Sequence, residues 1–165
     1  MVMYKRVETD KLKEIQAELI EYDFFNRTPD IITDDSPLES SRNSGAFFYG
    51  IPDLPKLKEF LGNVCHIENI THYHIINHVG GSGSDIHKDE DNSPWAINIP
   101  ILNCETSNTV FYDNDKKEVG RTTLDVPHFF NIEEYYHQVQ NYGDKNRTVI
   151  SFRFVGKKDL ADVIK

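Results

Sequence analysis

The sequence predicts a mainly β domain, a jelly roll or small barrel, in which the main helices come before the strands. Beyond residue 66, short runs rich in Ile, Val, Thr and aromatic residues follow one another with polar or Gly-rich turns between them. Helical periodicity is concentrated before residue 65. Strands at this density, with few helices among them, favour a jelly roll over a parallel α/β sheet.

Length and composition favour one acidic domain. The 165 residues are most simply one domain, with helical and loop support over 1–65, a β-barrel core over 66–155 and a C-terminal tail over 156–165. A net charge of −9 argues against a broad nucleic-acid-binding surface. No apolar run approaches the roughly 18 residues of a membrane helix. We therefore expect a cytoplasmic protein, with Cys65 and Cys104 as buried thiols.

The first predicted helix covers residues 11–22 and packs outside the barrel. Thr9 or Asp10 can serve as its N-cap, because each offers a side-chain oxygen to the free backbone N–H groups of the first turn. The apolar stripe of this helix consists of Leu12, Ile15, Leu19 and Ile20.

A long loop and a second helix follow. Residues 25–44 carry two prolines and several Asp and Ser residues, and a loop of this length is either a functional lid or locally mobile. The second helix covers 56–62, with Pro55 at its start and Gly62 at its end. It is also expected to support the barrel from outside.

Strands account for most of the remaining chain. They are predicted at 66–79, 95–102, 108–113, 118–126, 137–141 and 147–155. A flexible glycine-rich turn is expected at 80–84, and polar turns at 114–117 and 142–146. A short helix over 160–165 can end the chain.

His87, Asp89 and His137 have the chemistry of a facial metal site. Two imidazoles and one carboxylate hold non-haem Fe(II) and leave coordination positions open. On an extended strand residues i and i+2 share a face, so His87 and Asp89 can bind one ion while Lys88 turns away. His137, fifty residues after His87, would come from another strand. Asp91 is a competing carboxylate, but strand alternation favours Asp89.

Arg147 follows His137 by ten residues, at the start of the last predicted strand. A hairpin would bring it back beside His137, where its guanidinium could form a forked pair with a carboxylate next to the metal. Arg153 shares a strand face with Arg147, so both side chains can reach the site.

This pattern resembles that of the iron(II)/2-oxoglutarate-dependent oxygenases, which have His-x-Asp, a distal His and then a basic residue. The resemblance covers roughly residues 66–155 and implies a double-stranded β-helix, that is, a jelly roll. It implies that His87, Asp89 and His137 bind Fe(II) and that Arg147 binds the far carboxylate of 2-oxoglutarate, with Arg153 in reserve. The two arginines also resemble a strand of the branch that repairs alkylated nucleic acid, although the net charge argues against that branch.

Two further strands offer polar residues to the same site. The resemblance suggests that Asn77 or Tyr73 helps to hold the co-substrate, although core packing is the better interpretation of Tyr73. Asn98 interrupts an apolar strand, and a buried polar side chain needs a partner. A ligand near the iron and a hydrogen bond to a neighbouring loop explain Asn98 equally well.

The resemblance implies a dioxygenase that uses Fe(II), 2-oxoglutarate and O2 and releases succinate and CO2 as it hydroxylates a C–H bond. Its substrate would be a small molecule or a protein side chain. Substrate specificity in such barrels is determined by loops, here chiefly residues 25–46 and 80–94.

Three alternatives remain at this point. A cupin-like metal-binding barrel could act as a non-oxidative enzyme or a binding module, but it has no general need for Arg147. An inactive member of the fold would serve as an interaction protein, which the intact ligand set argues against. His72, His74 and His78 share a strand face and could hold zinc. His66 and His128 are interpreted as structural.

Overall fold

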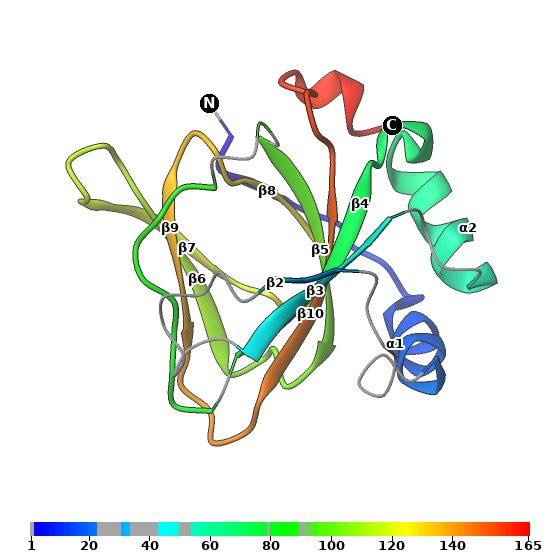
Figure 1. Ribbon diagram of the computed structural model, residues 1–165, viewed down its shortest axis with the longest axis horizontal. Coiled ribbons are helices and arrows are strands. Elements are labelled where there is room, and N and C mark those ends of the chain that lie inside the picture. The colour runs from blue at the N-terminus through cyan, green and yellow to red at the C-terminus, as the bar shows by residue number, and fades with distance from the viewer. Residues whose placement is uncertain are drawn as a thin grey trace.

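Two antiparallel sheets face one another in the computed structural model (Figure 1). In the larger sheet, ordered β1-β8-β5-β10-β4-β3-β2, the strands are Tyr4–Arg6, His128–Asn131, Trp95–Leu102, Arg147–Arg153, His72–His78, Asn43–Tyr49 and Ile31–Thr33. In the smaller sheet, ordered β7-β6-β9, they are Glu118–Thr123, Ser107–Tyr112 and Tyr136–Asn141. The prediction of a mainly β jelly roll is confirmed.

The structure describes residues 2–22, 31–33, 43–49, 54–78, 80–89, 92 and 94–165. Within these ranges only the backbone is described for 31–33, 43–49, His74 and Asn77. Most of the predicted loop over 25–44 lies outside the described residues, as does Asp91. The described part of that loop contains β2 and the start of β3, so the prediction of a loop is wrong there.

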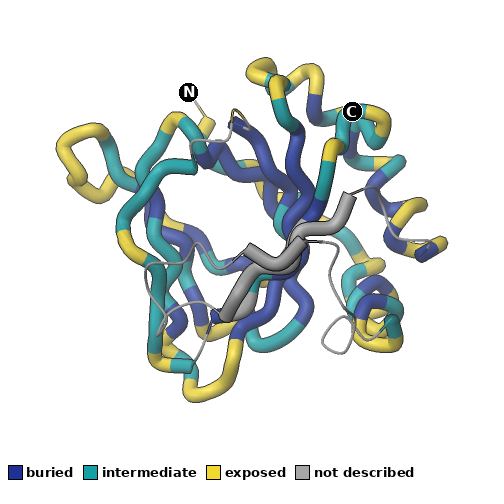
Figure 2. Tube along the Cα trace, in the orientation of Figure 1, coloured by how far each residue is buried: buried dark blue, intermediate teal, exposed yellow. Residues whose placement is uncertain are grey.

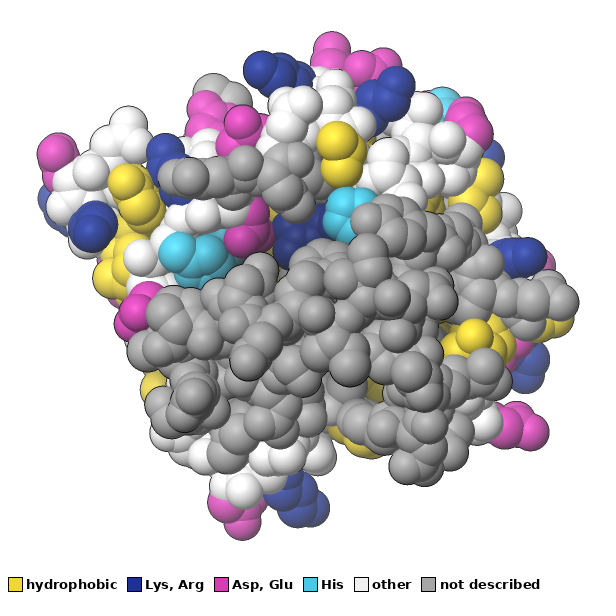
Figure 3. All heavy atoms as spheres, in the orientation of Figure 1, with side chains coloured by type: hydrophobic (Ala, Val, Ile, Leu, Met, Phe, Trp, Pro, Cys, Tyr) yellow, Lys and Arg dark blue, Asp and Glu magenta, His cyan; other side chains and the backbone are white. Residues whose placement is uncertain are grey.

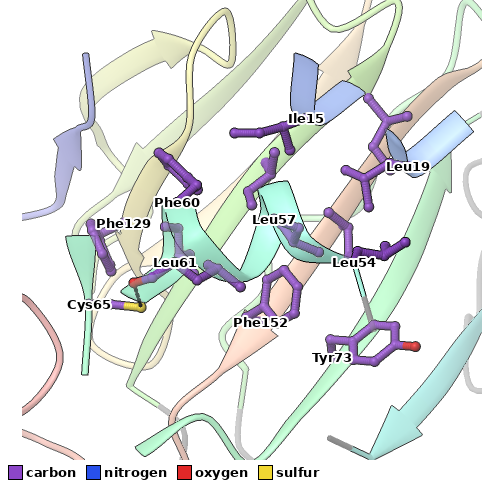
Figure 4. Packing of buried hydrophobic residues seen from close by; sticks show 14 of the residues in the cluster. Ile15, Leu19, Leu54, Leu57, Phe60, Leu61, Cys65, Tyr73, Phe129 and Phe152 are labelled. Atoms are coloured by element: carbon purple, nitrogen blue, oxygen red, sulfur yellow. Dashed lines mark hydrogen bonds between the residues drawn. The ribbon is translucent and has the colours of Figure 1, made fainter. Parts of the chain in front are cut away.

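Two helices cover the outer face of the larger sheet, on the side away from the smaller sheet (Figure 1). They are α1, Leu12–Glu21, and α2, Pro55–Val64. Each presents an apolar stripe to the sheet, and Figure 4 shows the resulting contact between α2 and β10. The fully buried side chains of this layer include Ile15, Leu19, Leu57, Leu61 and Phe152. The expected placement of the helices outside the barrel is confirmed.

The first helix differs from the prediction at its N-cap and at one position of its stripe. Lys11 occupies the N-cap position and makes no capping hydrogen bond through its side chain. The Thr9 hydroxyl, two residues before the N-cap position, accepts a hydrogen bond from the Lys11 N–H, which precedes the first helical residue. Ile20 is 47% exposed, because the buried stripe follows Ile15 and Leu19 and a helix turns by 100° per residue.

The second helix begins at Pro55 as predicted but continues through Gly62 to Val64. A glycine ends a helix when it adopts a positive φ, and the described glycines with positive φ are Gly81 and Gly156. Gly62 is therefore an ordinary helix position occupied by the residue with the greatest backbone freedom.

We expect Gly62→Ala to stabilise the protein by about 0.5–1 kcal/mol, because alanine loses less backbone entropy on folding. A Cβ at this position meets no atom within 4 Å. Denaturant unfolding measures the change. Gly83→Ala is the matched control and should destabilise the protein, since its Cβ would lie 2.4 Å from the Val139 carbonyl oxygen. A loss of stability in Gly62→Ala would contradict this interpretation of the helix.

Several strands also depart from their predicted bounds. The first predicted strand, at 66–79, begins only at His72, because Ile67–Asn69 form a short 3-10 helix, η2. Strand β8 was not predicted, nor was β1, with which it pairs. The expected terminal helix is confined to the 3-10 helix η3, Leu160–Asp162.

Strands β9 and β10 do not form the predicted hairpin. Strand β10 pairs with β4 on one edge and β5 on the other, so neither edge is free for β9. Strand β9 pairs with β6 in the smaller sheet. The turn at 142–146 therefore carries the chain from one sheet to the other, and Arg147 reaches the interior from the opposite wall to His137.

The space between the two sheets contains a second apolar cluster. It includes Phe111 of β6, Phe130 of β8 and Val149 of β10. Figure 2 shows buried residues along the central strands of the larger sheet, with exposed residues at the turns. No helix among the described residues is long and apolar enough to cross a membrane.

Candidate metal centre and ligand site

His87, Asp89 and His137 converge at one point between the sheets. One potential ligand atom from each lies within 4.8 Å of the other two. His87 Nε2 is 3.6 Å from Asp89 Oδ1, and His137 Nε2 is 3.8 Å from Asp89 Oδ2. Among the described residues this is the one group of three or more such side chains that could hold a metal ion.

Backbone pairing brings the two histidines together. His87 N–H donates to His137 O at 3.0 Å, and His137 N–H donates to His87 O at 2.8 Å. This pair is an isolated bridge on the edge of β9, so His87 and Asp89 are not on a regular strand as predicted. Asp89 is held separately, because its N–H donates to the carbonyl of Ile132.

The glycine-rich segment before His87 is held against β9, in contrast to the flexible turn predicted at 80–84. Gly83 forms a bridge to Gln140, and Ser84 N–H donates to Val139 O at 2.8 Å. The Ser84 hydroxyl accepts a hydrogen bond from Val139 N–H at 2.9 Å. Glycine is needed at position 83 because the β9 backbone passes too close for a Cβ. This segment sets the position of His87 relative to His137.

Both imidazoles present Nε2 to the centre of the triad. His87 Nδ1 lies 2.7 Å from the carbonyl oxygen of Asp85, and His137 Nδ1 lies 3.4 Å from that of Tyr135. A carbonyl can only accept, so Nδ1 carries a proton in each ring, and Nε2 is the nitrogen placed to bind a metal ion. Metal-bound histidines commonly show this arrangement.

The electrostatics of the site favour the protonation states that a cation requires. Burial would raise the pKa of Asp89, but the Arg153 guanidinium and the two imidazoles outweigh it and hold that pKa well below its ordinary value. Burial lowers the pKa of His137 from 6.5 to about 4, against the opposing effect of Asp89. At neutral pH Asp89 is therefore ionised and His137 is neutral.

Arg153, the reserve candidate for the co-substrate anchor, contacts the triad itself. Its Nη1 donates to Asp89 Oδ2 at 3.0 Å, and its side chain is 8% exposed. This contact fixes one carboxylate oxygen and leaves Oδ1 for other ligands. Arg153 therefore orients Asp89.

Arg147 lies buried at the other end of β10. Its Nε donates to Ser107 Oγ at 2.9 Å, and its Nη1 donates to His78 Nδ1 at 3.2 Å. Burial lowers the pKa of this guanidinium, which still remains charged at neutral pH. No carboxylate forms an ion pair with Arg147 in the described part of the chain. A buried cation next to two neutral acceptors is suited to an anionic ligand.

The other residues considered for co-substrate binding, Asn98, Tyr73 and Asn77, differ in where the structure places them. Asn98 faces the space between the sheets, and its Oδ1 is buried without a hydrogen-bond partner. Tyr73 lies on the opposite face of the larger sheet, where it packs on Phe152 with ring centroids 5.5 Å apart. The side chain of Asn77 lies outside the described part of the structure, so its role stays a prediction.

The other histidines have separate environments. His78 Nδ1 accepts from a guanidinium, which disfavours a zinc ion there, and the side chain of His74 is not described. His128 is fully buried, with Nδ1 on the Val126 carbonyl and Nε2 on the Thr122 hydroxyl. His66 lies 3.2 Å from Glu68 Oε1 at the surface. His66 and His128 thus have structural partners.

Histidine, acidic and basic side chains adjoin on the face shown in Figure 3, beside the residues drawn in grey. Sequence reasoning did not identify His78 and Ser107 as partners of Arg147. The pairing of Arg147 with His78 across β10 and β4 creates one of these contacts. Residues 69 positions apart in the sequence give no local signal of such a contact.

Similarity to known proteins is found at the level of structure. No protein-family model matches the sequence, and no curated protein matches it. A prolyl-4-hydroxylase from Pseudomonas putida is 12% identical with a TM-score of 0.63, over 93% of this chain and 91% of that chain.

Two further structures are similar. A prolyl hydroxylase from Trichoplax adhaerens, in complex with a peptide of the hypoxia inducible factor oxygen degradation domain, is 12% identical with a TM-score of 0.62. That match covers 92% of this chain and 83% of the other. A 2OG-Fe(II) oxygenase family oxidoreductase from Burkholderia pseudomallei is 12% identical with a TM-score of 0.58, over 91% and 80% of the two chains. The chain therefore has the fold of these oxygenases.

Proposed function

We propose that this protein is an Fe(II)- and 2-oxoglutarate-dependent dioxygenase that hydroxylates a C–H bond of its substrate. The observation that carries the proposal is the convergence of His87, Asp89 and His137 within 4.8 Å. Two imidazole nitrogens and one ionised carboxylate match the donor set of the facial Fe(II) triad. The shared fold of known oxygenases supports the same assignment.

The protein would hold and orient the reacting groups. When bound, Fe(II) supplies the oxidative chemistry by which O2 and 2-oxoglutarate become succinate and CO2 while the substrate gains a hydroxyl group. His87 and His137 would present Nε2 to the ion, and Asp89 would present Oδ1 while Arg153 holds Oδ2. Burial of His137 between the sheets limits access of water to that side of the ion.

Arg147 would bind the far carboxylate of 2-oxoglutarate. In the described part of the structure, Arg147 donates from Nε to Ser107 and from Nη1 to His78. Its Nη2 makes neither of these contacts and would bind the ligand. A guanidinium suits this task because it cannot lose its charge and matches a carboxylate in shape. Asn98 on β5 and Asn77 on β4, the two strands that flank β10, remain proposed co-substrate-binding residues.

The substrate would be a protein side chain or a small molecule. Two of the structures that share the fold are prolyl hydroxylases, so proline-containing peptides are the first substrates to test. The net charge of −9 argues against nucleic acid. The alternative, a cupin-like, non-oxidative barrel, has no general need for a buried charge at Arg147.

Formation of succinate from 2-oxoglutarate tests the proposal. Purified protein with Fe(II) should release succinate under air, faster when a true substrate from a panel of peptides, amino acids and metabolites is present. His137→Ala should remove this activity, whereas Gly62→Ala should retain it. Absence of succinate above the level of His137→Ala, with every member of the panel, would contradict the proposal.

A further inference from the structure

Among the buried side-chain atoms of the described residues, two polar atoms on the neighbouring strands β10 and β5 have no hydrogen-bond partner. Ser151 Oγ on β10 and Asn98 Oδ1 on β5 are fully covered, and neither makes a hydrogen bond. Ser151 as a whole is 0% exposed. A buried polar atom without a hydrogen bond lowers the stability of the folded state, so native proteins keep few of them. Such atoms are tolerated where a bound ligand satisfies them.

Both side chains face the space between the two sheets. Along β10, Ile150 and Phe152 belong to the cluster under the helices, while Val149 belongs to the cluster between the sheets. Side chains alternate along a strand, so Ser151 shares the inner face with Val149. Asn98 likewise shares the inner face of β5 with Ala96, which belongs to the cluster between the sheets.

The described neighbours of this pair are apolar or already hydrogen-bonded to other groups. Asn98 lies directly opposite Ser151 in the β5–β10 ladder, and His128 lies opposite Asn98 on the other side. Both ring nitrogens of His128 are already used by the Val126 carbonyl and the Thr122 hydroxyl. On the inner face the pair is flanked by Val149 and Pro100 on one side and by Arg153 and Ala96 on the other, and Arg153 is the polar one of these four. The two unpartnered atoms thus lie side by side in a cross-strand row that begins at His128 and continues on β4 at His74, whose side chain is not described.

This row lies between the two ends of the proposed site. A strand rises about 3.3 Å per residue, so Ser151 lies about 13 Å from Arg147 and about 7 Å from Arg153 along β10. Arg147 marks the anion-binding end, and Arg153 contacts Asp89 of the triad. A ligand that reaches from the triad toward Arg147 passes over Ser151 and Asn98.

We propose that Ser151 and Asn98 form the middle of the co-substrate site and hydrogen-bond to the oxo-acid end of 2-oxoglutarate. The inference rests on the proposed function and adds Ser151, which no motif indicated. At neutral pH 2-oxoglutarate offers only acceptors. The Ser151 hydroxyl donates to it, and a half-turn of the Asn98 amide about its last bond presents the NH2 group as a second donor.

Two substitutions at Ser151 and Asn98 test the proposal by calorimetric titration of 2-oxoglutarate into Mn(II)-loaded protein. Ser151→Ala should weaken binding about tenfold, the scale for a hydrogen bond to a charged group. Asn98→Asp keeps the shape of the side chain but adds a negative charge, so it should weaken binding further than Asn98→Leu does. Titration of Mn(II) alone should give the same affinity in the wild type and in Ser151→Ala.

The stability of the ligand-free protein provides a second readout that separates a binding role from a structural one. Ser151→Ala removes an orphan hydroxyl and should raise the midpoint of thermal unfolding by about 2 °C. Ser107→Ala is the matched comparison for stability, because the Ser107 hydroxyl donates to Cys104 O and accepts from Arg147. It should lower the midpoint.

The outcomes are distinguishable. Wild-type affinity for 2-oxoglutarate in Ser151→Ala would overturn this proposal and leave the proposed function standing. A fall in the unfolding midpoint of ligand-free Ser151→Ala, like that of Ser107→Ala, would overturn it as well, since it would show a structural role. Failure of the wild type to bind 2-oxoglutarate would overturn the proposed function and this proposal together.

Discussion

Replacing Asp89 by alanine is expected to lower the affinity of the protein for Fe(II) or Mn(II) by more than about 100-fold. Loss of an outer partner of a metal ligand commonly costs 10- to 100-fold, and loss of the ligand itself costs more. Asp89 also supplies the one negative charge of the triad. Without it, two imidazoles would face a cation beside the positively charged guanidinium of Arg153. Calorimetric titration of Mn(II) measures the loss.

Asp85→Ala is the matched control for this substitution. Asp85 is an exposed residue four positions earlier, and its contact with His87 is made by its backbone carbonyl, which alanine retains. Its Mn(II) affinity should equal that of the wild type. Full Mn(II) affinity in Asp89→Ala would show that Asp89 is not a ligand.

Replacing Arg147 by alanine is expected to weaken binding of 2-oxoglutarate by about 2–4 kcal/mol, the scale for removing one partner of a buried, hydrogen-bonded charge pair. This corresponds to a loss of about 30-fold to 1000-fold in affinity. Arg147→Lys should recover only part of the loss, because an ammonium cannot reproduce the forked contact. Titrations at saturating Mn(II) measure each value.

The Arg153→Ala variant distinguishes the role of Arg153 from that of Arg147. Because Arg153 holds Asp89 Oδ2, its removal should act mainly on the affinity for Mn(II). At saturating Mn(II) it should cost less 2-oxoglutarate affinity than Arg147→Ala. If the Arg153 variant loses 2-oxoglutarate while the Arg147 variant binds normally, Arg153 is the anchor.

The central strands could be predicted because their residues form continuous apolar or β-branched runs. Strand β5 has the predicted bounds of Trp95 and Leu102, and strand β10 begins at the predicted Arg147. Both are covered by neighbours on each edge. Burial on all sides selects Ile, Val and Phe, and that composition is visible in the sequence.

The short strands β1 and β8 could not be predicted in the same way. Strand β1 has three residues and β8 has four, too few for an alternating pattern to emerge. They form because each pairs with a strand far away in the sequence. The prediction of a hairpin between β9 and β10 is wrong for a related reason. A polar turn between two strands looks the same in a hairpin and in a crossing between sheets.

The triad was accessible to sequence reasoning because its chemistry is local. His-x-Asp places two ligand types two residues apart, and the third follows at the start of a short strand. The roles of Arg153 and Arg147 required the register of the sheets. Arg153 meets Asp89 across 64 residues, and Arg147 meets Ser107 across 40. Single-sequence patterns carry no information on such pairings.

The most direct test of this account is a titration of 2-oxoglutarate into the wild-type protein, with Mn(II) and without it. We predict one binding site that is detected only with the metal, because the ion on His87, Asp89 and His137 supplies one end of the site and Arg147 the other. Equal binding with and without Mn(II), or no binding in its presence, would contradict the account.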